Sequence, residues 1–167
     1  MDIRAMLADV PLFGQSLDPA QIDALASRAR VVLFETGTRI IQENDSGATM
    51  YAIVKGSVSV TVEDTAGKRK VATLGPGQIF GEISLLTGLP RLGTVTANEP
   101  VEAVEITRDM LRPILEGAPK LYDRLGHVLQ KRQGDLDQIV DSDFWAQFGR
   151  SRENLAKVMR RNFAEAR

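Results

Sequence analysis

The spacing of apolar residues along the chain changes twice and predicts three regions. In residues 1–30, Ile22, Leu25 and Ala26 fall on one face of a helix, after a helix-start signal in which Ser16 or Asp18 is the cap and Pro19 lies in the first turn. Short segments with glycine-rich breaks follow from residue 31 to residue 106, which is typical of strands and tight turns. Helical spacing then returns after Thr107.

The central region predicts an antiparallel β structure. Residues 58–62 alternate apolar and polar side chains with a period of two, as a half-buried strand does. Further strands are expected at 71–74, 95–97 and 101–106, with a hairpin tip at 64–67 and a turn at 75–77. Many short strands at this spacing favour a sandwich or barrel.

One stripe of side chains runs along the predicted helix that follows. Leu125, Leu129, Arg132, Leu136 and Ile139 are spaced by four and three residues, so they share one face. One interpretation of an arginine in an apolar stripe is that its stem lies along the stripe while its guanidinium reaches water.

Residues 142–167 form a separate tail with amphipathic helical spacing. Its apolar positions are Phe144, Trp145, Phe148, Leu155, Val158, Met159 and Phe163. Its basic residues outnumber its acids; they are Arg150, Arg152, Lys157, Arg160, Arg161 and Arg167. We expect one or two helices that pack on their own domain or on a partner subunit, in preference to a membrane surface.

Composition excludes several kinds of chemistry. The 167 residues include no cysteine, so disulfides and thiol nucleophiles are excluded. The only histidine is His127, so a multi-histidine metal centre is impossible, and an ordinary surface role is expected for it. A net charge of −1 argues against a protein that coats nucleic acid. No window reaches the roughly 20 apolar residues that span a bilayer, so a cytoplasmic protein is expected.

The stretch Phe80–Val95, FGEISLLTGLPRLGTV, carries the most specific candidate chemistry. Gly81 lets a ligand approach the backbone closely, and a short helix after it would offer free N–H groups to an anion. Arg91 has a planar fork of donors suited to two phosphate oxygens, and Glu82 is suited to a sugar hydroxyl. The pattern favours a nucleotide pocket; the alternative is that Glu82 and Arg91 form a surface ion pair of little consequence.

This stretch resembles the phosphate-binding cassette of the cyclic nucleotide-binding domain family. The matching residues are Phe80-Gly81-Glu82-Ile83-Ser84-Leu85-Leu86 and Pro90-Arg91-Leu92-Gly93-Thr94-Val95. The segments Val10–Phe13, Tyr51–Gly56 and Gly75–Gly81 are also similar to the family, so that the resemblance covers about residues 5–135.

The resemblance implies a mainly β fold, a jelly-roll-like β-roll of about eight strands with helices at both ends. The implied organisation is a binding domain over residues 1–135, with a helical lead-in at 1–30, a β-roll at 31–106 and lid helices at 107–141, and then the tail at 142–167.

The resemblance also implies a role for each site residue. Glu82 would accept the ribose 2′-hydroxyl, and Arg91 with the backbone around Gly81, Ile83 and Ser84 would hold the cyclic phosphate. The implied ligand-binding set is Gly81, Glu82, Ile83, Ser84, Arg91, Leu92, Gly93, Thr94, Val71, Leu129 and Arg132. Of these, Val71 would support the base, and Leu129 and Arg132 would touch it from the lid.

The implied ligand is cAMP in preference to cGMP. The family usually has alanine after the arginine where cAMP is preferred, and often threonine where cGMP binds. Leu92 stands at this position and cannot donate the hydroxyl bond that favours guanine. No cofactor, no metal and no chemistry on the ligand are implied.

Such a domain could belong to a transcription regulator, to a kinase regulatory subunit, or to a channel or stand-alone protein. The residues after Ser142 are too few for a helix-turn-helix domain, so direct nucleic-acid binding is not expected, and few residues precede the domain for a kinase docking segment. The runs around Met110–Leu115 and Val128–Gln133 resemble the ending of small bacterial cyclic-nucleotide-gated channels. The prediction is therefore a sensor attached to an inner-membrane channel, or a stand-alone binding protein; contact between copies through the C-terminal helices is the other expected partnership. A cupin-type jelly-roll enzyme is the remote alternative.

Overall fold

The computed structural model describes residues 2–141, 143–148 and 154–165. Three short helices open the chain: α1 (Ile3–Ala8), α2 (Pro11–Gly14) and α3 (Pro19–Ala26). Asp18, one of the two predicted caps, starts α3: its side chain accepts from the backbone N–H of Gln21, whose own side chain accepts from the N–H of Asp18. This reciprocal capping satisfies donors that a helix start leaves free.

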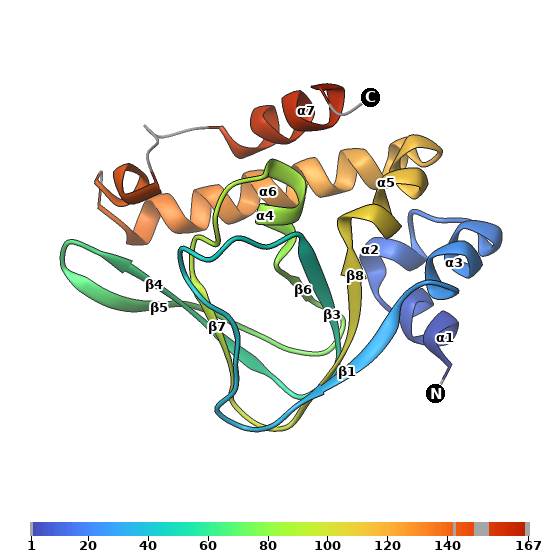
Figure 1. Ribbon diagram of the computed structural model, residues 1–167, viewed down its shortest axis with the longest axis horizontal. Coiled ribbons are helices and arrows are strands. Elements are labelled where there is room, and N and C mark those ends of the chain that lie inside the picture. The colour runs from blue at the N-terminus through green and yellow to red at the C-terminus, as the bar shows by residue number, and fades with distance from the viewer. Residues whose placement is uncertain (1, 142, 149–153, 166–167) are drawn as a thin grey trace.

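Eight strands form two four-stranded sheets that face one another (Figure 1). One sheet has the order β1-β8-β3-β6 and the other β2-β7-β4-β5, and every neighbouring pair is antiparallel. The strands are β1 (Arg30–Phe34), β2 (Arg39–Ile41), β3 (Thr49–Lys55), β4 (Val58–Asp64), β5 (Gly67–Leu74), β6 (Ile79–Phe80), β7 (Thr94–Ala97) and β8 (Val101–Thr107). The predicted fold class, mainly β and jelly-roll-like with flanking helices, is confirmed.

The predicted strands and turns correspond to elements of the structure. The four predicted strands correspond to β4, β5, β7 and β8, and residues 64–67 form the tip of the β4–β5 hairpin. The candidate cassette begins with β6, continues into the six-residue helix α4 (Glu82–Thr87), and ends in β7. The predicted short helix is therefore present, and both of its ends are glycines with positive φ, Gly81 and Gly88.

The C-terminal helices lie across one end of the two sheets (Figure 1). They are α5 (Arg108–Glu116), the long α6 (Pro119–Ile139), the 3₁₀ helix η1 (Phe144–Phe148) and α7 (Leu155–Glu165). Helix α7 contacts both α4 and α6, so the tail packs on its own chain as expected. Arg150, Arg152 and Arg167 lie outside the described residues, and the division of the chain between 141 and 142 stays a prediction. In the described part of the chain, no helix combines the length and the apolar character that crossing a bilayer requires.

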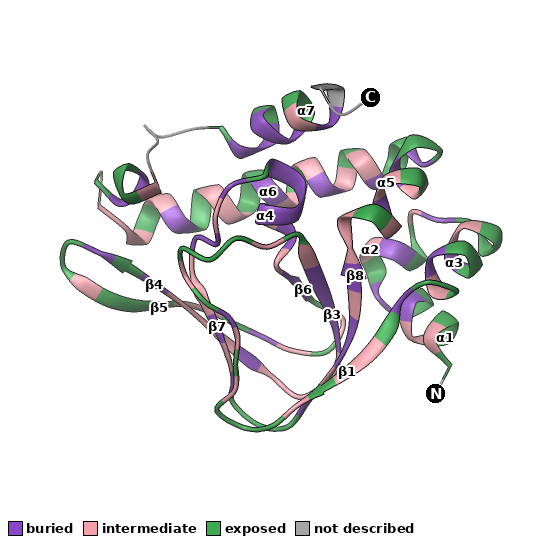
Figure 2. Cartoon of the chain, in the orientation of Figure 1, coloured by how far each residue is buried: buried purple, intermediate pink, exposed green. Residues whose placement is uncertain are grey.

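Two clusters of buried side chains hold the layers together. One lies between the two sheets and includes Ile53, Val58, Phe80 and Val95. The larger one joins the N-terminal helices, the β1-β8-β3-β6 sheet and helices α4 to α7. Figure 2 shows that α4 is almost entirely buried, in contact with both the sheet and the C-terminal helices. His127 is exposed on α6, as expected.

A first prediction concerns α6, which the larger cluster attaches to the sheet. Leu125 is completely buried, so Leu125→Ala should lower the free energy of unfolding by about 2–5 kcal/mol, because it removes apolar contacts and leaves a cavity. Leu33, which is 67% exposed on edge strand β1, is the matched control, and Leu33→Ala should change stability by no more than about 0.5 kcal/mol. Urea unfolding measures both. Equal effects would contradict the placement of α6 in the core.

Candidate functional site

A pocket opens between the β2-β7-β4-β5 sheet, helix α4 and the C-terminal half of α6. Apolar strand residues form its wall: Ile41, Val60, Val62, Val71, Ala72, Leu74 and Val95. The charged side chains at the pocket are Glu82, Arg91, Arg132 and Asp135. An apolar wall with a few convergent charged groups is the usual character of a small-molecule site.

Arg91 is the buried cation of this pocket. It is 5% exposed; its Nη1 donates to the carbonyl oxygen of Gly81 at 2.9 Å, and its Nη2 donates to the carbonyl and hydroxyl oxygens of Thr49 at 2.9 and 3.0 Å. Burial lowers the pKa of Arg91 from its ordinary value, while Tyr51, Glu82 and Asp45 act in the opposite direction. An arginine stays protonated at neutral pH even so. The three oxygens that hold the guanidinium are all neutral, so they fix its position without cancelling its charge.

The backbone fits closely around this guanidinium. Gly81 has a φ of +86°, and a Cβ there would lie 2.7 Å from the carbonyl oxygen of Thr49. A Cβ at Gly47 would lie 2.6 Å from Nε and Nη2 of Arg91. Gly81 therefore needs glycine for its conformation and its space, whereas a larger residue at Gly47 would displace the guanidinium of Arg91.

Glu82 pairs with an arginine, but the partner is Arg132 and not Arg91. Nε of Arg132 donates to Oε1 of Glu82 at 2.9 Å, and its Nη2 donates to the carbonyl oxygen of Ile79 at 2.8 Å. The side chain of Glu82 is 3% exposed and that of Arg132 is 25% exposed. The interpretation that Arg132 extends its charge into water is therefore wrong. The interpretation that Glu82 and Arg91 form a surface ion pair is also wrong, because both are buried and Glu82 pairs with Arg132. The pair joins α4 to the face of α6 that lies over the pocket.

The structure brings most of the predicted site residues together. Gly81, Glu82, Ile83, Ser84, Arg91, Leu92, Gly93, Val71 and Arg132 all line the pocket. Thr94 and Leu129 are not among the lining residues. The hydroxyl of Thr94 accepts from the backbone N–H of Glu43, and Leu129 is completely buried in the larger core cluster. The role that each residue plays toward a ligand stays a prediction.

Sequence reasoning missed Thr49, Gly47 and Asp135. Thr49 and Gly47 contact Arg91 from a segment more than 40 residues earlier in the chain, and no local spacing marks such a contact. Asp135 lies three residues after Arg132 on α6 and lines the pocket, although it is exposed. Helical spacing could have found it, because residues i and i+3 share a face.

The family model of the cyclic nucleotide-binding domain matches residues 31–117, which contain both sheets except one residue of β1, all of α4 and all of α5. The chain belongs to the cyclic nucleotide-binding domain family. Residues Phe80–Val95, on which the sequence resemblance rests, lie inside the matched range.

Proteins similar to this cyclic nucleotide-binding domain include a transcriptional regulator, a potassium channel and a regulatory domain of PKA. It is 29% identical, over 93% of its length, to a CRP-like cAMP-activated global transcriptional regulator of Mycobacterium tuberculosis, of which it spans 70%. It is 30% identical, over 77% of its length, to the cyclic nucleotide-gated potassium channel mll3241 of Mesorhizobium japonicum, of which it spans 34%. A solved structure of the regulatory domain of Toxoplasma gondii PKA with cAMP is 27% identical with a TM-score of 0.66, and the match covers 83% of this chain and 52% of that one.

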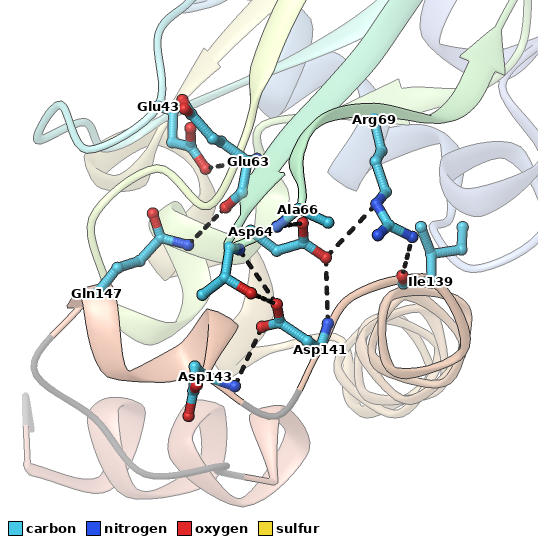
Figure 3. Close-up of polar contacts among 10 residues, drawn as sticks. Glu43, Glu63, Asp64, Ala66, Arg69, Ile139, Asp141, Asp143 and Gln147 are labelled. Atoms are coloured by element: carbon cyan, nitrogen blue, oxygen red, sulfur yellow. Dashed lines mark hydrogen bonds and ion pairs between the residues drawn. The ribbon is translucent and has the colours of Figure 1, made fainter.

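In this cyclic nucleotide-binding domain, the C-terminal end of α6 is tied to the β4–β5 hairpin (Figure 3). The carboxylate of Asp64, whose side chain is fully buried, accepts from the backbone N–H groups of Ala66 and Asp141 and lies 3.5 Å from Nε of Arg69. Arg69 also donates to the carbonyl oxygen of Ile139, the last residue of α6. We call Asp64, Arg69 and Asp141 the hairpin clasp.

Further contacts reinforce the hairpin clasp. Asp141 accepts from both the backbone N–H and the hydroxyl of Thr65, and the bond from that hydroxyl is the main cause that holds the pKa of Asp141 below its ordinary value. Gln147 in η1 donates to the carbonyl oxygen of Glu63 (Figure 3). Because β4 and β5 also form the pocket wall, the clasp fixes the end of α6 relative to that wall.

A second prediction tests the hairpin clasp. Asp64→Ala leaves two N–H groups without their acceptor and removes the carboxylate partner of Arg69, so it should lower the free energy of unfolding by about 1–3 kcal/mol and speed amide exchange at the end of α6. Glu63→Ala is the matched control, because Glu63 is exposed and contributes to this contact through its backbone. Denaturant unfolding and hydrogen exchange measure the two effects. If Asp64→Ala behaves like the control, the clasp does not hold α6.

Proposed function

We propose that this chain is a non-catalytic sensor of a cyclic nucleotide, with cAMP as the preferred ligand. The observation that carries the proposal is the buried guanidinium of Arg91, held by three neutral oxygens at the edge of an apolar pocket. A buried cation held by neutral groups is costly, and an anion that reaches it from the pocket offsets that cost. Membership of the family indicates which anion, the phosphate of a cyclic nucleotide.

Each part of the ligand has a suitable counterpart in the pocket. The cyclic phosphate would lie against Arg91 and the backbone around Gly81, Ile83 and Ser84, which line the pocket together. The ribose 2′-hydroxyl would donate to Glu82, and the base would pack on the apolar wall that includes Val71. Arg132 would then contact the ligand from α6, which serves as the lid helix.

The mechanism that we propose is a population shift. Because Arg132 already binds Glu82, a ribose hydroxyl at Glu82 has to share that carboxylate with it or replace it. The ligand therefore changes the free energy of the arrangement in which α6 contacts α4. A ligand that touches both α4 and α6 favours one position of α6, and this position is the signal passed to an attached effector.

The preference for cAMP rests on the residue after Arg91 and on the relatives. Leu92 lines the pocket and offers no hydroxyl to guanine. The Mycobacterium tuberculosis relative is described as cAMP-activated, and the Toxoplasma gondii structure contains cAMP.

The proposal also concerns the protein to which this domain belongs. A channel sensor is supported by the match to the Mesorhizobium japonicum channel, of which this chain spans about a third. A stand-alone binding protein is the alternative. In either case α6 and the elements that follow it would carry the signal.

A third prediction tests the phosphate contact. Arg91→Ala should weaken cAMP binding by about 2–4 kcal/mol, because the phosphate would lose its charged donor. Arg39→Ala, at an exposed arginine on β2, should leave the affinity unchanged. Calorimetric titration measures both, and circular dichroism confirms that each variant is folded. The same affinity in both variants would mean that the anion is held elsewhere.

A fourth prediction uses Asp135 to test where the base lies. A guanine edge offers a carboxylate two adjacent donors, N1–H and N2–H, whereas adenine offers the single 6-amino group. Asp135 therefore acts against the preference for cAMP that Leu92 supports, and Asp135→Ala should weaken cGMP binding roughly threefold or more relative to cAMP. Gln130→Ala, also exposed on α6, serves as the control. Competition titrations with both nucleotides give the ratio; an equal change for the two would place the base away from Asp135.

A further inference from the structure

Helix α7 contacts both α4 and α6. Figure 1 shows α7 running alongside α6, with α4 close to both. The apolar face of α7 is buried in this contact; its residues are Leu155, Ala156, Val158, Met159 and Phe163. Phe163 makes an edge-on contact with Tyr122 of α6, and the guanidinium of Arg108 from α5 lies 5.4 Å from its ring centre.

One polar contact connects α7 directly to the helix that lines the pocket. Nδ2 of Asn162 donates to the carbonyl oxygen of Leu86, in the last turn of α4, at 2.9 Å. A helix leaves its last carbonyls without partners inside the helix. The neighbouring carbonyls of Ile83 and Ser84 are satisfied by Thr87 and Gly88 of the chain itself, whereas Leu86 takes its donor from α7.

Helix α4 needs such external support. It has six residues, too few to be stable by itself, and its flanking glycines adopt positive φ. Glu82, Ile83 and Ser84 reach the pocket from this helix. A small displacement of α4 would therefore move a whole side of the site.

Two consecutive residues of α6, Arg132 and Gln133, contact the pocket and α7 respectively. Arg132 binds Glu82 and Ile79 on the pocket side, while Oε1 of Gln133 accepts from the backbone N–H of Leu155, the first residue of α7. A movement of α6 relative to the pocket therefore also moves the start of α7, whose other end holds α4.

We propose that Asn162 is a positioning residue for ligand binding: by capping the C-terminal end of α4 from outside, it holds Glu82, Ile83 and Ser84 in the pocket. Binding of the ligand and docking of α7 are then coupled, and each strengthens the other. This inference rests on the proposed function for the identity of the ligand, but the hold of α7 on α4 does not depend on it.

The test compares wild type with Asn162→Asp and Lys157→Ala. An aspartate has nearly the same shape but can only accept, so it loses the bond to Leu86 and places a carboxylate against a carbonyl. Lys157 is exposed on α7 and is the matched control. Hydrogen exchange of the α4 amides is measured without nucleotide, with amides of β3 and β8 as the internal reference for global stability. Affinity for cAMP is then measured by calorimetry.

In Asn162→Asp, exchange in α4 should rise about tenfold while β3 and β8 keep their rates, and the Kd for cAMP should rise by a similar factor. Lys157→Ala should match wild type in both measurements. Unchanged exchange in α4, or a rise shared equally by β3 and β8, would overturn the positioning role, as would an unchanged Kd. If wild type binds no cyclic nucleotide at all, the proposed function fails, and the exchange of α4 still decides whether α7 holds it.

Discussion

The guanidinium of Arg91 sets the main constraint on this domain. It is a buried cation whose three acceptors are neutral oxygens from Gly81 and Thr49, so the surrounding backbone has to fit around it. Gly81 is required for its positive φ and its close approach to Thr49, Gly47 leaves space for the guanidinium, and β3 is drawn against the turn that starts α4. The same arrangement leaves a fixed positive charge next to an apolar pocket, which is the property that selects an anionic, partly apolar ligand.

A second group of contacts determines where α6, the proposed lid helix, lies. Arg132 connects the middle of α6 to Glu82, and the hairpin clasp connects its end to the β4–β5 hairpin, part of the opposite wall of the pocket. The two contacts differ in what a ligand does to them. A sugar hydroxyl at Glu82 would compete with Arg132, whereas the clasp lies outside the set of residues that line the pocket and would persist. A ligand is therefore expected to adjust α6 about a fixed end and not to release it.

The sequence predicted what local spacing and a contiguous motif can encode. The period of two in residues 58–62, the capped start of α3 and the motif at Phe80–Val95 all correspond to the structure. It did not predict that Thr49 holds Arg91, that Asn162 caps α4 or that Asp64 binds the end of α6, because these contacts join segments 42 to 77 residues apart. Arg132 was ambiguous for the same reason: its helical stripe was visible, but its partner Glu82 lies 50 residues away.

The function proposed for this chain requires that it bind a cyclic nucleotide in the pocket beside Arg91. Calorimetric titration of the wild-type chain with cAMP tests it most directly, with 5′-AMP as a control that keeps the base, sugar and a phosphate but lacks the ring closure. We expect saturable binding of cAMP at one site per chain, at concentrations of tens of micromolar or lower, and weaker binding of 5′-AMP. The absence of binding by both cAMP and cGMP at those concentrations would contradict it.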